Sequence, residues 1–282
     1  MKRHDLFNSL HLLMIFTVTV AMFTFCNREK AFDDSYLQMT LATNMNAPTT
    51  KATVNNVWNG GEQVQVSIDN GAAVTFTAFT NGTLVPVSPL YWQNESQSIT
   101  ARAWHPASWT FPVNQSAGLQ AADFIFASTV TGITASNYTD KPLVFRHRTA
   151  KITVVLTAGT DISNLNSATV AFYGYTTGAP NTNDTGNGVI AGLGNGWVSP
   201  QKINSDTYSA LLIPRDMTGQ QFVKITISGI DHFYIPTAGQ AVLQQGMEYA
   251  YNITVYKTRI EVVVASGIVW TEGNEYHISP NY

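Results

Sequence analysis

The sequence has little cysteine and little charge, and each scarcity excludes a class of protein. One cysteine among 282 residues excludes an intrachain disulfide and any zinc site built from several cysteines. Charged residues make up 12% of the chain, against roughly 25% in an average soluble protein, and the net charge is −3. Because no basic patch is visible, the charge gives no reason to expect binding to nucleic acid.

Motifs for catalysis and for metal binding are also missing. The sequence has no Gly-x-Ser-x-Gly motif, no Cys–His pair and no glycine-rich phosphate loop, and its acidic residues are scattered near turns. The histidines stand singly, without partners at the spacing that metal sites use. We therefore expect no enzyme activity, no catalytic residue, no metal and no cofactor.

What the chain does contain favours β-strands. Threonine is abundant, with 34 residues, and aromatic residues make up 11%. Residues 63–69 alternate between polar and apolar, and Asn70-Gly71 and residues 74–77 follow, which predicts a β-hairpin. Residues 151–156 and 249–256 alternate in the same way. Strands about every ten residues, separated by turns, are typical of stacked antiparallel β-sandwiches.

The same patterns suggest two domains in an all-β chain. The strand pattern restarts at Ala150, so we place the boundary near residue 148, with one domain over residues 26–148 and the other over residues 149–282. Residues 176–196 are rich in Gly, Asn and Thr and lack periodicity, so we expect an exposed, mobile loop there.

Residues 1–25 are interpreted as a signal peptide. They begin with Lys2 and Arg3 and continue into an apolar stretch that is short for a membrane span. Cys26, the single cysteine, follows directly, where lipidation of a mature N-terminus would take place. The large Phe25 stands where lipidation signals have a small residue, so a buried or unprocessed cysteine remains the alternative.

Four segments, in this order and spacing, resemble the fimbrillin-like (Mfa-like) family. They are Thr50-Lys51-Ala52, the run Trp58-Asn59-Gly60-Gly61-Glu62, residues 145–152 (FRHRTAKI) and residues 246–258 (GMEYAYNITVYKT). The resemblance implies two transthyretin-like antiparallel β-sandwich domains in tandem, in a surface lipoprotein of the outer membrane. It also implies a component of adhesive fimbriae, with other fimbrial subunits, the membrane lipid held through Cys26, and host or bacterial surface ligands as partners.

Family members that polymerise lose their first strand to a protease and accept a strand from the next subunit, which is a form of β-strand addition. Mapped on this sequence, the displaced strand is residues 36–41, with pocket-filling residues Leu37, Met39 and Leu41. The candidate donor strand contributes Ile260, Val262, Val264, Ile268 and Trp270. The hypothesis needs a loosely paired first strand, and a segment that is absent from either sandwich, or locked centrally with partners on both sides, would end this argument.

Two alternatives remain open on the sequence alone. Lys51 is the only basic residue of residues 43–56 and hence the candidate processing site, but polymerising relatives are cut after arginine, so we favour an ordinary solvated loop charge over a processing site. The chain could also be a monomeric surface lipoprotein that binds glycans through exposed aromatics, for which Trp92, Trp104 and Trp109 are candidates; core packing is the ordinary role of such residues.

Overall fold

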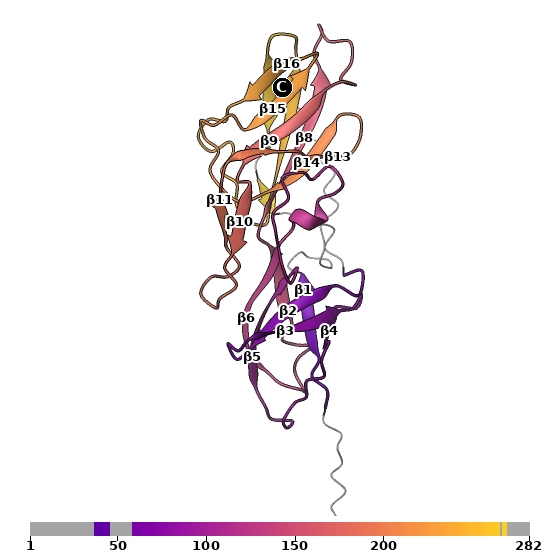
Figure 1. Cartoon of the computed structure of the whole chain (residues 1–282), viewed down its shortest axis with the longest axis vertical. Helices are drawn as coiled ribbons and strands as arrows, with labels where there is room; N and C mark the ends of the chain where they lie inside the picture. Colours follow the sequence, from indigo (N-terminus) through magenta and orange to yellow (C-terminus); the bar gives the residue numbers. More distant parts are fainter. Residues whose placement is uncertain (1–36, 46–57, 266, 270–282) are drawn as a thin grey trace, which may run out of the picture.

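The computed structural model describes residues 37–45, 58–265 and 267–269, and within them the chain is all-β, which confirms the predicted class (Figure 1). The helical structure of these residues is one 3-10 turn, η1 (Gln120–Ala122). Figure 1 shows an elongated molecule, with the first half of the chain at one end and the second half at the other.

Seven strands of the first half form a closed barrel in the order β1-β4-β3-β2-β5-β6-β7. Their bounds are β1 Leu41–Met45, β2 Gln63–Ile68, β3 Ala73–Ala78, β4 Thr83–Pro86, β5 Ile99–His105, β6 Ile125–Ile133 and β7 Leu143–His147. Of the antiparallel β-sandwich that we expected here, the strands are mostly antiparallel, but the sheet closes on itself and one pairing, β1 with β7, is parallel. The sheet closes because β1 pairs with β4 on one side and, in parallel, with β7 on the other.

The predicted hairpin is present as β2 and β3, with Val66 opposite Val74. Its turn lies one residue earlier than the Asn70-Gly71 pair suggested. Asp69 and Asn70 occupy the two central positions with φ of 48° and 58°, and the Gly71 N–H donates to the Ile68 carbonyl over 2.8 Å. Two consecutive left-handed residues form the turn that matches the twist of a hairpin, and Asp and Asn tolerate that conformation.

Strands of the second half form two larger sheets and a hairpin. One sheet has the order β13-β14-β8-β17-β18, with β19 also on β17; another has the order β12-β9-β15-β16; β10 and β11 pair with each other. The bounds are β8 Ala150–Ala158, β9 Thr169–Gly174, β10 Thr177–Pro180, β11 Ile190–Leu193, β12 Gly196–Val198, β13 Gln201–Lys202, β14 Thr207–Leu212, β15 Val223–Ile227, β16 Ile230–Tyr234, β17 Met247–Val255, β18 Ile260–Val264 and β19 Ile268–Val269. β8 and β17 are parallel, which their long separation in the sequence permits.

Buried side chains gather in two clusters. The first fills the barrel and includes Leu41, Trp58 and Phe145. The second fills the second half, but it also takes in residues that precede the expected boundary, among them Phe111 and Phe124. The boundary expected from the sequence therefore does not coincide with the division between the two core clusters. The boundary near residue 148 stays a prediction.

Gln115 joins the loop before η1 to a strand of the second half. Its side chain is 1% exposed; its Nε2 donates to the Leu211 carbonyl and its Oε1 accepts from the Leu211 N–H, both over 2.8 Å. The amide thus satisfies a donor and an acceptor on β14 as a neighbouring strand would. Loss of this side chain would leave both backbone groups buried without a partner, at about 1–3 kcal/mol each.

Most of residues 176–196 are exposed, as we expected, but they are not an irregular loop. They contain the hairpin of β10 and β11, which reaches the first half beside β6 (Figure 1). Arg102 Nε on β5 donates to the Thr182 carbonyl over 2.9 Å, and Thr129 on β6 donates to Asp184. A Cβ on Gly188 would lie 2.5 Å from Phe126, so glycine allows this close approach.

Candidate functional site

Strand β1 and the residues before it occupy a slot between β4 and β7, which we name the β1 slot (residues 37–45 and the strand edges that they contact). Leu41 lies opposite Leu84 of β4, and Thr43 lies opposite Leu143 of β7. The register covers two residue pairs with β4 (Leu41↔Leu84, Ala42↔Thr83) and three with β7 (Thr43↔Leu143, Asn44↔Val144, Met45↔Phe145). Both ladders are short, but the first strand has partners on both sides. Our expectation of a loosely paired segment is therefore wrong.

Residues before β1 extend the contact along a second stretch of chain. The Met39 N–H donates to the Leu90 carbonyl over 2.8 Å, and the Trp92 N–H donates to the Leu37 carbonyl over 3.0 Å. Gln38 forms an isolated antiparallel bridge with Tyr91. The regular strand thus covers residues 41–45, later than the predicted residues 36–41, although the earlier residues are also paired.

Two of the three predicted pocket-filling side chains are buried. Met39 is 4% exposed and Leu41 is 1% exposed, and both belong to the barrel core. Leu37 is 54% exposed, so the prediction that it fills a pocket is wrong. It lines an open surface hollow with Glu95 and Ser136, beyond the last ladder partner, where none of the described strands covers it. Alternation identifies the face of a strand but not the point at which the core ends.

A polar contact that the sequence did not indicate holds β1 in place. Trp58, 2% exposed, donates from Nε1 to the Thr43 hydroxyl over 3.0 Å. The Thr43 hydroxyl and the Thr43 N–H each donate to the Gly82 carbonyl over 2.8 Å. Gly82 has φ of +81°, and a Cβ there would lie 3.2 Å from the Thr43 carbonyl oxygen. Trp58 also meets Phe145 edge to face, with ring centroids 5.5 Å apart.

The predicted donor residues lie on the outer strand of a second-half sheet. Among the described residues, β18 has a ladder partner on one side only, β17, and β19 pairs with the first residues of β17. Three alternate side chains of β18 are half-buried against the second cluster: Ile260, Val262 and Val264. Val263 between them is 56% exposed. Ile268 lies on β19 and is half-buried.

Three of the predicted site residues lie outside the described residues: Cys26, Lys51 and Trp270. The signal peptide lies outside them as well. The structure therefore leaves lipidation and processing as predictions.

Within the described ranges there is no group of three or more Cys, His, Asp or Glu side chains close enough to hold a metal. His147 is 5% exposed, and its Nδ1 lies 2.9 and 3.0 Å from the two carboxylate oxygens of Asp123. Beside it, burial lowers the pKa of Arg148 to about 10, and Arg146 adds to this effect. No helix in the described part of the chain has the length and apolar character needed to cross a membrane.

The tryptophans considered for glycan binding pack against the two clusters. Trp92 is 3% exposed in the barrel core, and Trp104 and Trp109 are half-buried against the second cluster. Trp104 stacks on Phe126 with ring centroids 6.5 Å apart. These three residues act in packing, and they offer no exposed aromatic platform.

A sequence profile of the fimbrillin-like family matches residues 50–269. Comparison with curated protein sequences finds no match. Two solved proteins provisionally assigned to cell adhesion, from Bacteroides uniformis and Bacteroides ovatus, align with TM-scores of 0.67 and 0.63. Each is 17% identical to this chain and covers 84% of it, and the alignments span 99% and 98% of those proteins.

The tip fimbrial protein Mfa3 of Porphyromonas gingivalis aligns with a TM-score of 0.50 and 12% identity, over 83% of this chain and 100% of that one. At these identities the structural matches show a common fold. The family profile covers most of the chain, including β2 to β19. On this match, the chain belongs to the fimbrillin-like family.

Proposed function

We propose that the chain is a component of adhesive fimbriae that joins other subunits by strand exchange at the β1 slot. Membership of the fimbrillin-like family supports a fimbrial, cell-surface role. The tip location of Mfa3 is a property of that protein, so the position of this chain in a fimbria is left open. The proposed role is structural, with no catalytic step.

The observation that carries the proposal is the construction of the slot itself. Met39 and Leu41 bury their side chains in the barrel, and β1 supplies ladder partners to both β4 and β7. Removal of the segment would leave two unpaired strand edges and two apolar vacancies side by side. Such a gap accepts an extended chain whose alternate residues are apolar.

The candidate donor strand, β18, has alternate apolar residues, as the slot requires, and it lies at the outer edge of its own sheet. β18 presents Ile260, Val262 and Val264 on one face, and among the described residues it is paired with β17 alone. Transfer into the slot of another subunit would give it two ladder partners in place of one. Each additional backbone hydrogen bond adds about 0.5–1.5 kcal/mol.

The pairing of β1 on both sides makes cleavage a necessary step in this proposal. β1 is held by β4 over residues 41–42 and by β7 over residues 43–45, so fraying from one edge does not release it and the segment must first be severed from the barrel. We propose Lys51 as the processing site, because it follows β1 and precedes Trp58 in the sequence. Cys26 is the proposed lipid anchor in the outer membrane.

Trypsin treatment tests the proposal. We expect the protein to gain a new N-terminus at Ala52 and then to form ladders that resist SDS in unheated samples, because a strand bonded on both sides dissociates slowly. The variant Lys51→Gln should give neither product. The matched variant Lys202→Gln changes an exposed lysine elsewhere and should behave as the wild type. Mass spectrometry and gel electrophoresis are the measurements, and cleavage after Lys51 that yields only monomers would rule out polymerisation.

A further inference from the structure

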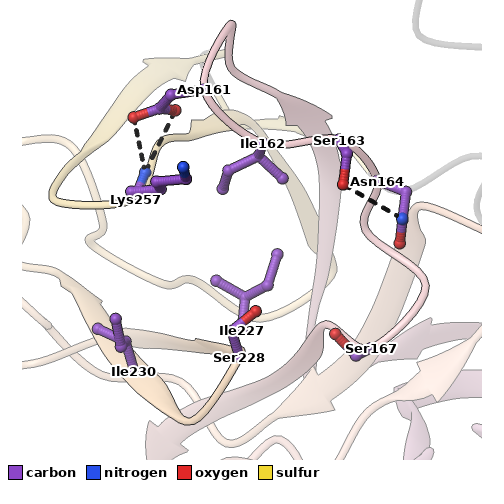
Figure 2. A pocket seen from close by; sticks show the side chains of 9 residues that line it. All are labelled: Asp161, Ile162, Ser163, Asn164, Ser167, Ile227, Ser228, Ile230 and Lys257. Carbon is purple, nitrogen blue, oxygen red and sulfur yellow. Dashed lines mark hydrogen bonds between the residues drawn. The ribbon is translucent and has the colours of Figure 1, made fainter.

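A hollow of about 370 Å³ opens between loops of the second half, away from the β1 slot (Figure 2). Residues 161–167 between β8 and β9 form one wall, the turn between β15 and β16 forms the opposite wall, and Lys257 contributes from the turn between β17 and β18. The volume lies within the range of small-molecule sites, roughly 300–1,000 Å³. Loops that converge at the end of a β-sandwich are a common place for binding.

One side of the hollow carries a carboxylate and an ammonium group. Both oxygens of Asp161 accept from the Lys257 backbone N–H, over 3.3 and 3.2 Å, which fixes the carboxylate at the rim. Each oxygen retains a further lone pair for a ligand hydroxyl. The Lys257 ammonium belongs to none of the ion pairs formed by the described residues, and its side chain extends toward Ile162 in Figure 2.

The rest of the lining combines apolar surface with neutral polar groups. Ile162 and Ile227 point toward one another across the opening in Figure 2, and Ile227 is continuous with the core of the second half. Ser163 and Asn164 lie along one wall, and Ser228 lies beside Ile227. Serine hydroxyls donate and accept, so this wall suits a ligand whose groups also do both.

We propose that this hollow binds a neutral hexopyranose, either a free sugar or the terminal residue of a glycan. Adjacent sugar hydroxyls can donate to Asp161 and accept from Lys257 at the same time, while the C–H face of the ring lies on the partly exposed Ile162, beside the buried Ile227. The charges of Asp161 and Lys257 are opposite, and the Arg259 charge close to Asp161 is offset by its ion pair with Glu261, so a ligand with a net charge would meet a like charge in the hollow. Hence the site favours an uncharged ring.

Saturation-transfer NMR on the whole chain tests the inference with D-glucose, D-galactose, D-mannose and N-acetyl-D-glucosamine as probes. We expect at least one of them to bind with a millimolar dissociation constant. Lys257→Gln and Asp161→Asn should each weaken that binding about tenfold or more, because each removes a charged hydrogen-bonding partner. Thermal melting of each variant shows that it is folded.

Lys224→Gln and Asp231→Asn are the matched controls. Lys224 lies over the ring of Trp197 and Asp231 accepts from Thr226, both outside the hollow, so these variants should keep wild-type affinity. D-glucuronate and D-glucosamine should bind more weakly than D-glucose if glucose is the sugar that binds.

Three outcomes would overturn the inference: no transfer from any of the four probes up to about 50 mM, unchanged affinity in Lys257→Gln and Asp161→Asn, or tighter binding of a charged sugar. The sugar measurement uses the uncleaved chain, in which β18 stays paired with β17, so its result does not depend on strand exchange. A Lys257→Gln variant keeps the β1 slot intact and should form the same ladders after trypsin treatment as the wild type.

Discussion

A chain that begins at Ala52 is expected to lose the stability of its first-half barrel. Such a chain lacks Met39 and Leu41, whose removal from a core costs about 2–5 kcal/mol each, and it leaves β4 and β7 with unpaired edges. The total is comparable to the whole stability of a domain, about 5–15 kcal/mol. Differential scanning calorimetry should show the barrel transition displaced to much lower temperature or absent.

The matched control is a chain that begins at Leu37 and so keeps every described residue of the slot. Its barrel transition should coincide with that of the longer protein, because it keeps Met39, Leu41 and every described ladder partner of β1. A chain beginning at Ala52 that melts with the same transition as this control would show that β1 contributes little, and the exchange proposal would then lose its energetic basis.

Trp58→Ala is expected to have the largest effect of any single substitution near the slot. The side chain is 2% exposed and meets Phe145, and its Nε1 donates to Thr43 on β1. Replacing a buried tryptophan by alanine costs about 3–5 kcal/mol through lost packing and the cavity that remains. Urea unfolding, followed by circular dichroism, measures the change in the free energy of unfolding.

Trp197→Ala is the control for Trp58→Ala. Trp197 lies half-buried among Tyr173, Phe233 and Lys224, so its loss should cost less, under about 2 kcal/mol. Thr43→Val removes the acceptor of the Trp58 N–H and should cost about 1–3 kcal/mol. Equal losses for Trp58→Ala and Trp197→Ala would contradict the role that we give to the contact between Trp58 and β1.

Regular alternation of polar and apolar residues in the sequence predicted several of the strands. β2, β3, β8 and β17 were predicted because one face of each is buried and the other is more polar, and this contrast is local to each strand. The resemblance to the fimbrillin-like family agrees with the family profile over residues 50–269. These features depend on a few neighbouring residues or on motif order, and both can be read from one chain.

Features that depend on distant residues were not predictable in the same way. Gln115 takes the place of a strand on β14, and Gly188 fits against Phe126, although each pair lies far apart in the sequence. The exposure of Leu37 and the two-sided pairing of β1 also follow from where β4 and β7 lie. No periodic pattern marks these contacts, because each involves one residue and a partner elsewhere in the fold.

The central claim is that the β1 slot of one subunit receives the C-terminal strand of another, and a photo-crosslinker at Val263 tests it most directly. Val263 is 56% exposed on β18, so the probe can be introduced without disturbing the core. After cleavage, mass spectrometry should find it joined to β4 or β7 of a second subunit, and before cleavage it should not be. Crosslinks that stay within the probe's own chain in the cleaved protein would contradict the claim.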